Sequence, residues 1–330
     1  MKLKLGIAGV GYLGRHHARK FSVMPGVDLC GVFDVNPDNA TQIAEELNLH
    51  IFSSYDELLA ACEAVDIVAT TSAHFDLAHR ALQTGKHVFV EKPITAELAQ
   101  AKTLVELAAQ NKLILQVGHI ERFNPVILAV EEEIKNPMFI ESHRLSTFQP
   151  RGTDVPVVLD LMIHDIDLIL DFVDSPVKDI HASGVGILTP SIDIANARIE
   201  FANGAIANVT SSRVSMKQER KIRFFQKDAY FSLDFGAKHA TVLKRSPDAL
   251  KYLPRILAGD KDIKAEHLVD IRNFDLSETD KDALTLELES FVNSVLNNKQ
   301  PIVDGQAGSR ALEVALRIIE TIGTQPRTHI

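Results

Sequence analysis

Short apolar runs and stretches of helical periodicity alternate along the first third of the chain. Strands that are apolar throughout are buried on both faces, so the alternation predicts a parallel sheet covered by helices on both sides. This pattern is typical of a doubly wound α/β domain. The predicted strands are Leu3–Ala8, Val27–Phe33, Ala64–Thr70, His87–Val90 and Leu113–Val117. The predicted helices are Tyr12–Phe21, Asn39–Leu47, Asp76–Gln83 and Ala96–Ala109.

The pattern changes after Asn124, where strand-like segments follow one another without helices between them. Such a succession is typical of an antiparallel sheet. The predicted strands are Met138–Thr147, Ile180–Ile187, Ile194–Phe201, Ala205–Arg213, Lys221–Gln226, Ala229–Asp234 and Ala240–Leu243. Helices are predicted over Val158–Val173, Lys281–Leu296 and Ser309–Ile322, and Ser246–Asp280 is charged and irregular. We therefore expect two domains, an α/β domain at 1–122 and an α+β domain with a largely antiparallel open sheet at 123–330.

The composition narrows the possible partners. The 330 residues are 45% hydrophobic and 24% charged, and the net charge is −9. A nucleic-acid or membrane-surface role would need a basic face, which this acidic balance disfavours. No apolar run reaches the roughly 18 residues of a membrane span. The histidines and cysteines also lack metal-site spacing, so we expect no metal.

Two cysteines, Cys30 and Cys62, lie in or near apolar runs. Buried unpaired thiols are favoured over a disulfide or redox pair, and they suit a reducing compartment. The apolar stretch in Met1–Leu5 is too short for a signal peptide and is followed by glycines. We therefore expect a cytoplasmic protein.

The clearest motif is Gly9-Val10-Gly11-Tyr12-Leu13-Gly14, which follows a predicted strand and opens a predicted helix. In this dinucleotide fingerprint Gly9 permits the tight turn, Gly11 lets the backbone approach a pyrophosphate, and Gly14 permits close helix–strand packing. The positive end of the helix dipole faces the phosphates. The motif predicts a Rossmann domain that binds a nicotinamide cofactor. A plain strand–turn–helix connection is the alternative.

Asp34 lies 20 residues beyond Gly14, at the end of the second predicted strand. A carboxylate there accepts hydrogen bonds from both hydroxyls of the adenosine ribose. It would repel the extra phosphate of NADP, and no arginine follows in Val35–Pro37 to neutralise it. NAD is therefore favoured over NADP. The alternative is an ordinary turn residue before Asn36-Pro37.

Lys92 lies just past the carboxyl end of a predicted strand, the edge at which open α/β sheets bind ligands. An ammonium beside a cationic nicotinamide ring could serve in proton transfer. The following Pro93 permits a cis peptide bond. Taken alone, a lysine at a strand end is as readily a solvated surface residue.

A second candidate group is the polar stripe of one predicted helix, Asp160, His164, Asp167 and Asp171, at spacings that share a face. It is either the solvated side of an amphipathic helix or a narrow stripe facing a cleft. Nearly all other positions are apolar, an arc wider than surface helices carry. In a cleft, Asp160 and His164 would form a carboxylate–imidazole pair in which His164 acts as a base.

These motifs together resemble the glucose–fructose oxidoreductase/inositol dehydrogenase/rhizopine catabolism (Gfo/Idh/MocA) family. The resemblance rests on the glycine fingerprint, on Glu91-Lys92-Pro93 and on Asp160-x-x-x-His164. It extends almost to the end of the chain through Leu286–Phe291 and Ala311–Ala315. The resemblance implies NAD(P)-dependent oxidation or reduction of sugar or cyclitol carbons. It makes Lys92, Asp160 and His164 the catalytic residues. Thr71 stands where the family commonly has proline. The implied cofactor-binding residues are Gly9, Gly11, Tyr12, Leu13, Gly14, Asp34, Thr70, Thr71, Ser72, His74, Glu91 and Lys92.

Within the family, Gly118–Pro125 and Val158–Asp165 are most similar to bacterial enzymes that oxidise the C3 hydroxyl of UDP-N-acetylglucosamine on a route to lipid A. A nucleotide-sugar substrate carries a pyrophosphate, which arginine forks suit. Besides the three catalytic residues, the expected substrate contacts are Arg122, Asn124 and Arg151, with Arg144 and Arg213 as further candidates.

The resulting hypothesis is a dehydrogenase in which His164 takes the hydroxyl proton, Lys92 hydrogen-bonds the oxygen, and hydride passes to NAD. The alternatives are a dehydrogenase of a free sugar or inositol, an imine reductase on the same scaffold, or a cofactor-bound sensor without turnover. Lys92 and His164 argue against the sensor, which needs neither. An open sheet face, with the resemblance, favours a homodimer or homotetramer.

Overall fold

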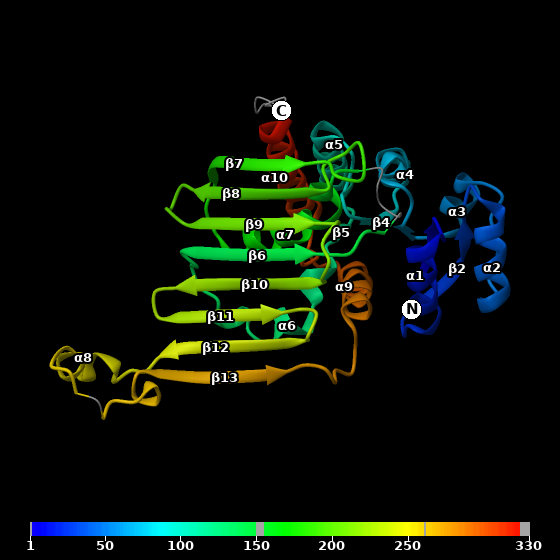
Figure 1. Cartoon of the computed structure of the whole chain (residues 1–330). Coiled ribbons are helices and arrows are strands. Elements are labelled where there is room, and N and C mark those ends of the chain that lie inside the picture. The colour runs from blue at the N-terminus through cyan, green and yellow to red at the C-terminus, as the bar shows by residue number, and fades with distance from the viewer. Residues whose placement is uncertain (1, 150–154, 261, 324–330) are drawn as a thin grey trace. The chain divides into compact units, whose positions relative to one another are not determined.

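The computed structural model describes residues 2–149, 155–260 and 262–323. The chain divides into two compact units (Figure 1). The first contains Met1–Phe123 and Lys281–Val314, and the second contains Asn124–Asp280 and Ala315–Ile330. Among the described residues, no helix is long and apolar enough to cross a membrane.

The first unit is built on a five-stranded parallel sheet of order β2-β1-β3-β4-β5, which confirms the predicted fold class. Its strands are β1 (Leu3–Ala8), β2 (Val27–Phe33), β3 (Ala64–Ile67), β4 (His87–Glu91) and β5 (Leu115–Gly118). Its helices are α1 (Tyr12–Val23), α2 (Pro37–Leu47), α3 (Tyr55–Ala61), α4 (Thr71–Gln83), α5 (Leu98–Asn111) and α9 (Ala283–Asn297). The strand order reverses at β1, and such a switch point opens a crevice at the carboxyl edge of the sheet.

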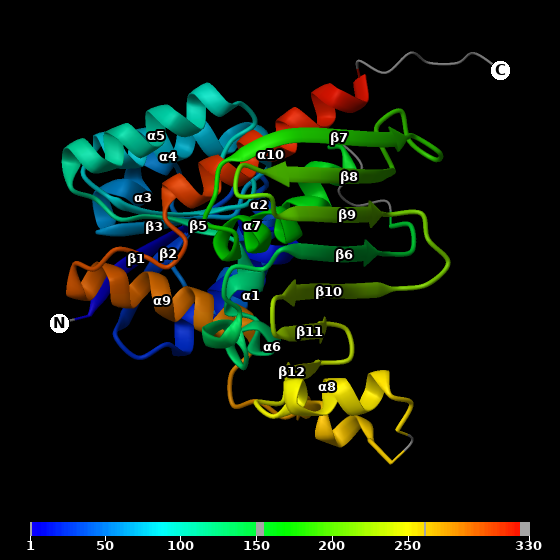
Figure 2. The same cartoon turned by 90° about the vertical axis from the view of Figure 1, so that its left-hand side faces the viewer.

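Helices cover both faces of this sheet (Figure 2), with α4 and α5 on one face and α1 and α9 on the other. The strands β1, β3, β4 and β5 bury nearly every side chain, as at Leu5, Ile7 and Val88–Val90. Side-chain caps set the starts of two helices. The Asn36 side chain accepts the N–H of Asp38 at the start of α2, and the Ser54 hydroxyl accepts the N–H of Glu57 at the start of α3.

The segment Lys281–Val314 belongs to the first unit, although the boundaries drawn from the sequence, 1–122 and 123–330, assigned it to the second domain. The Phe291 ring on α9 packs on Phe89 of β4, with ring centroids 5.7 Å apart. Further on, α10 (Gly305–Gly323) begins so close to β5 that a Cβ atom at Gly308 would lie 2.6 Å from Val117. These contacts join residues far apart in the chain, which periodicity does not reveal.

The second unit is built on an eight-stranded sheet of order β13-β12-β11-β10-β6-β9-β8-β7. Only β6 and β9 pair in parallel, so the sheet is largely antiparallel as expected. Its strands are β6 (Phe139–Leu145), β7 (Val177–Val185), β8 (Ile194–Phe201), β9 (Ile206–Ser212), β10 (Glu219–Gln226), β11 (Ala229–Asp234), β12 (His239–Arg245) and β13 (Val269–Asp275). Its helices include α6 (Pro125–Leu128), α7 (Ile163–Phe172) and α8 (Ala249–Leu257).

Most strands of this sheet alternate between a buried and a more exposed face, as β6, β8 and β11 do. The buried face carries Ile140, Val209 and Phe224, and α7 packs on it through Phe172, whose ring centroid lies 5.0 Å from that of Phe224. The edge strand β13 and the helix α8 lie in the segment predicted to be irregular. That prediction was wrong because β13 is an exposed edge strand rich in charged residues.

Candidate active site

The fingerprint turn is sterically restricted at two of its three glycines. Gly9 has φ +93°, and a Cβ atom on it would lie 2.6 Å from the Val68 carbonyl oxygen. A Cβ atom on Gly14 would lie 2.0 Å from the Gly9 oxygen, whereas one on Gly11 would meet nothing within 4 Å. The space beside Gly11 is open at the point where α1 begins, so the turn fits the pyrophosphate of a dinucleotide.

Asp34 is held at this turn by two backbone groups. Its Oδ2 accepts the N–H of Val10 and its Oδ1 accepts the N–H of Asn36, each at 2.8 Å. It therefore serves both as the turn residue before Asn36 and as a carboxylate fixed beside the fingerprint. Sequence reasoning missed Arg15, whose Nε donates to the Gly11 oxygen at 3.3 Å and whose Nη1 donates to Gln42.

The loop after β3 contributes further predicted cofactor residues. Thr70 precedes the first turn of α4, and its hydroxyl lies 3.2 Å from that of Ser72. His74 is buried and lies between two backbone oxygens, that of Pro93 at 2.8 Å and that of Ala69 at 3.1 Å. Burial lowers the pKa of His74. Its imidazole joins the loops after β3 and β4.

Lys92 is half-buried and follows β4 directly, and the Lys92–Pro93 peptide bond is cis. The backbone N–H of Lys92 donates to the Glu91 Oε2 at 3.1 Å. Gly118, at the end of β5, makes room for that carboxylate, because a Cβ atom there would lie 2.9 Å from the Glu91 Cδ and Oε1. The loop that presents Lys92 thus rests on the Glu91 side chain.

A buried charged cluster lies beneath this loop, formed by His17 of α1, Asp66 of β3 and Glu91 of β4. The His17 Nδ1 lies 3.0 Å from the Asp66 Oδ2, and its Nε2 lies 3.4 Å from the Glu91 Oε1. In the sequence, His17 is one of the histidines whose spacing does not suit a metal site, and no motif gives it a role. An aspartate inside the apolar run of β3 was the signal that could have revealed the cluster.

The cluster shifts the pKa values of its members. Burial disfavours the imidazolium of His17, but the two carboxylates outweigh it and raise the pKa to about 10. Burial likewise disfavours the charged form of Glu91, yet His17 and Lys92 outweigh it and lower the pKa of that carboxyl. His17 is therefore an imidazolium at neutral pH.

In the second unit, Asp160 lies in a π-helical turn (Val158–Met162) and His164 in the first turn of α7, and both side chains are half-buried. π-Turns often mark functional positions in helices. Of the predicted stripe, Asp167 is buried and Asp171 exposed. The stripe is therefore not uniformly exposed, and Asp160 and His164 stay the candidates.

The arginines considered for the substrate differ in their surroundings. Arg144 is buried and donates from Nε and Nη2 to Asp165 at 3.0 and 2.8 Å, and Arg213 is buried and donates to the Val155 oxygen at 2.6 Å. Both are engaged within the second unit. Arg122 is buried in the 3-10 helix η1 (Ile120–Phe123).

The remaining substrate candidates are Asn124 and Arg151. The Asn124 Oδ1 caps α6 by accepting the Val126 N–H at 3.0 Å. Arg151 lies outside the described residues.

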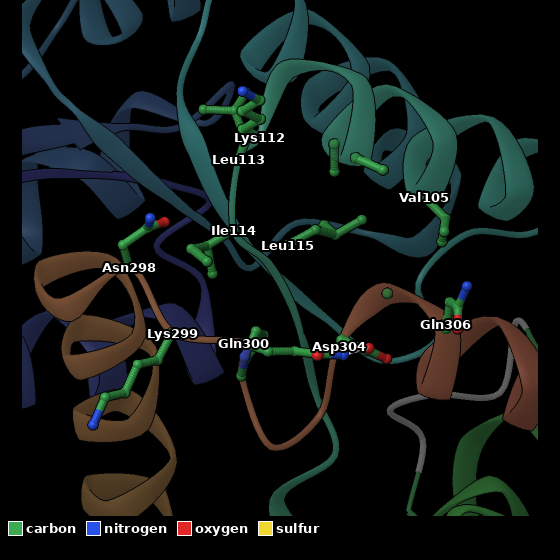
Figure 3. Close-up of a pocket in the computed structure, with 14 residues that line it drawn as sticks. Val105, Lys112, Leu113, Ile114, Leu115, Asn298, Lys299, Gln300, Asp304 and Gln306 are labelled. Carbon is green, nitrogen blue, oxygen red and sulfur yellow. Dashed lines mark hydrogen bonds between the residues drawn. The ribbon is translucent and has the colours of Figure 1, made fainter.

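A cavity of about 420 Å³ lies near the amino end of β5, away from the strand ends that carry Lys92 (Figure 3). Its walls are α5 and the segment joining α9 to α10, with Ile114 and Leu115 between them. The Asp304 carboxylate already caps α10 by accepting the Ala307 N–H at 2.8 Å. The cavity therefore contains none of the chemistry expected of the active site.

A doubly wound sheet with an open glycine turn, a fixed acid after β2 and a lysine after β4 defines a dinucleotide-dependent oxidoreductase. The model described as oxidoreductase family, NAD-binding Rossmann fold, matches residues 3–119, and that of the GFO/IDH/MocA C-terminal domain matches residues 137–231. The chain belongs to the Gfo/Idh/MocA family, and it is an NAD(P)-dependent dehydrogenase that acts on a CH–OH group.

Two curated relatives align along nearly the whole chain. UDP-N-acetylglucosamine 3-dehydrogenase of Acidithiobacillus ferrooxidans is 36% identical over 317 residues, which are 96% of each chain. The NAD(+)-dependent scyllo-inositol 2-dehydrogenase of Bacillus subtilis is 27% identical, covering 96% of this chain and 92% of its own. A solved structure of the Acidithiobacillus enzyme matches with a TM-score of 0.87 over 98% of both chains.

The raised pKa of His17 predicts a pH dependence of stability. Between pH 6.5 and about 10 the folded protein keeps a proton that the unfolded chain has lost. The free energy of unfolding therefore falls as pH rises through this window, by at most about 1.4 kcal/mol per pH unit. Urea titrations followed by circular dichroism measure it. We expect His17→Gln to flatten this slope and His50→Gln, an exposed control, to keep it; equal slopes in all three proteins would refute the assignment.

Proposed function

We propose that the protein oxidises the C3 hydroxyl of UDP-N-acetylglucosamine to a ketone with NAD. The observation that carries this proposal is the 36% identity to a UDP-N-acetylglucosamine 3-dehydrogenase along 96% of both chains. The relative named for scyllo-inositol is less similar, at 27%. A free sugar or inositol is therefore the second candidate substrate.

Three residues carry the proposed chemistry. His164 accepts the proton of the sugar hydroxyl, and Asp160 orients the imidazole and stabilises its charged form. Lys92 donates a hydrogen bond to the same oxygen as it becomes a carbonyl. Bound NAD supplies the hydride acceptor.

The nucleotide-sugar pyrophosphate needs cations. Arg122, which lies in the Gly118–Pro125 motif, and Arg151 are the arginines that we propose for this contact, and Asn124 adds an amide two residues after Arg122. Arg144 and Arg213, which donate to Asp165 and to Val155 within the second unit, stay further candidates.

Removal of the proposed base gives a direct test. His164→Ala should lower kcat on UDP-N-acetylglucosamine by about 10²–10⁴-fold, because general-base assistance contributes that much. The affinity for NAD should not change. Turnover is measured by the absorbance of NADH, and cofactor affinity by calorimetry.

The control for this test is Asp171→Asn, an exposed position on the same helix, which should keep wild-type turnover. The panel also contains N-acetylglucosamine, myo-inositol and scyllo-inositol. Full activity of the His164→Ala variant would refute the assignment of His164 as the general base. Faster turnover of a cyclitol than of the nucleotide sugar by the wild-type protein would refute UDP-N-acetylglucosamine as the substrate.

We also propose that NAD is preferred over NADP because of Asp34. Asp34→Ala should weaken NAD binding by about 10–100-fold, as expected for the loss of hydrogen bonds to a charged acceptor. It should also remove the repulsion toward NADP, so the ratio of the two KM values moves toward NADP. Asp38→Ala, an exposed acid in the first turn of α2, is the control. An unchanged ratio would exclude the ribose assignment.

We further propose that the chain forms a homodimer or homotetramer through the more exposed sheet face of the second unit. The strand registers support this, because they align one lateral row of apolar side chains across six strands. Ring centroids of Phe139 and Phe225 are 5.7 Å apart, and those of Phe225 and Tyr230 are 4.9 Å apart. The row is Ile206, Phe139, Phe225, Tyr230, Leu243 and Ile271. Such a row is suited to burial against a second copy.

A charge within the row should disrupt this assembly. Phe225→Glu is expected to lower the molar mass measured by light scattering to that of one chain, since the buried carboxylate would lack a partner. Met216→Glu adds the same charge at a residue that is 99% exposed, and it should keep the wild-type mass. A wild-type protein of single-chain mass would refute the proposal.

A further inference from the structure

We propose that His17 is a positioning residue for Lys92: its imidazolium keeps the Glu91 carboxylate charged and in place, and that carboxylate holds the backbone of Lys92. No motif of the sequence assigned a role to His17. The proposal concerns residues of the first unit, and it rests on the proposed function only where it refers to turnover.

The geometry provides the first step. His17 is fully buried, and its two ring nitrogens face carboxylates on two neighbouring strands. The Nδ1 lies 3.0 Å from Asp66 and the Nε2 lies 3.4 Å from Glu91. An imidazolium has a donor on each nitrogen and so suits this arrangement, whereas a neutral ring would present a lone pair to one of the two acids.

The second step leads from Glu91 to Lys92. The Glu91 Oε1 faces His17, and its Oε2 accepts the Lys92 N–H at 3.1 Å. The Gly118 position leaves just enough room for the carboxylate, since a Cβ atom there would lie 2.9–3.0 Å from its Cδ and both oxygens. The carboxylate is therefore confined between β5 and His17, and a change at His17 is transmitted to the backbone of Lys92.

The third step concerns charge. The cluster of one imidazolium and two carboxylates carries a net charge of −1. Lys92 and His74 are further titratable groups that act on Glu91. The Phe89 ring packs edge-on against the His17 ring, with the ring centroids 5.8 Å apart. Without the imidazolium, two carboxylates would share a buried site, and such pairs cannot both stay ionised near neutral pH. Burial raises the pKa of Asp66, whereas Lys92 lowers that of Glu91, so the two carboxyls would share this proton as a coupled pair. A Glu91 carboxyl that shares the proton is a weaker acceptor for Lys92.

The experiment compares three variants. His17→Gln removes the positive charge, His17→Gln/Asp66→Asn leaves Glu91 as the one carboxylate of the cluster, and His17→Gln/Glu91→Gln leaves Asp66. Both double variants restore the net charge of −1, but only the first keeps the acceptor of Lys92. A role confined to packing or overall charge would affect the two doubles alike.

The first readout needs no substrate. Amide hydrogen exchange at Lys92, followed by NMR of protein labelled with ¹⁵N-lysine, should be at least about tenfold faster in His17→Gln. The His17→Gln/Asp66→Asn protein should regain slow exchange, and His17→Gln/Glu91→Gln should not. Equal exchange in wild type and His17→Gln, or in the two doubles, would overturn the proposal.

The second readout is turnover of UDP-N-acetylglucosamine. His17→Gln should lower kcat by about 10–100-fold, as misplacement of a reacting group does. The kcat of His17→Gln should rise with pH as the Asp66–Glu91 pair loses its shared proton, and this extra ionisation should disappear in His17→Gln/Asp66→Asn. A pH profile of the wild-type shape in His17→Gln would overturn the proposal.

Two single variants keep the test decisive if His17→Gln does not fold. Asp66→Asn leaves the His17–Glu91 pair and should keep near wild-type exchange at Lys92, whereas Glu91→Gln should accelerate it. Equal effects of these two variants would overturn the proposal. If the exchange rates at Lys92 follow the expected pattern but no sugar is turned over, the proposed function is refuted and the positioning role of His17 stands.

Discussion

The close approach of α1 to β1 is the constraint on which the site of the first unit depends. At Gly14 the helix passes so near the strand that a Cβ atom would lie 2.0 Å from the Gly9 oxygen. This approach directs the N–H groups of the first turn toward the open side of Gly11, where a pyrophosphate fits. It also brings the next turn of the helix, with His17, down onto β3 and β4.

That position explains an otherwise costly cluster in an apolar core. Burying a charge costs several kcal/mol unless it is paired, and Asp66 and Glu91 provide the pairing for His17. Each member comes from a different element, so the cluster forms only when α1, β3 and β4 are in register. The same three groups support the loop of Lys92, which couples correct folding of the domain to presentation of the lysine.

Local sequence signals predicted much of this arrangement. Strand–turn–helix periodicity gave β1 and β2 with their observed bounds, and the strand ends placed Asp34 and Lys92 at the carboxyl edge. The contacts that periodicity could not predict join distant residues, such as Phe89 with Phe291 and His17 with Asp66. Asp165, one position outside the predicted polar stripe of α7, turned out to bind Arg144, because pairing within a core depends on packing that spacing alone does not specify.

The two units also differ in how firmly their polar side chains are held, and this difference concerns substrate specificity. In the first unit, the glycine turn and the buried His17–Asp66–Glu91 cluster shape the edge of the sheet proposed to bind the cofactor, so substitutions there would disturb the fold. In the second, Asp160 is half-buried in the π-helical turn and His164 at the start of α7, while Arg144 of β6 holds α7 by donating to Asp165. Side chains around Asp160 and His164 can therefore vary without loss of the scaffold. A shared fold thus suits relatives named for a nucleotide sugar and for an inositol.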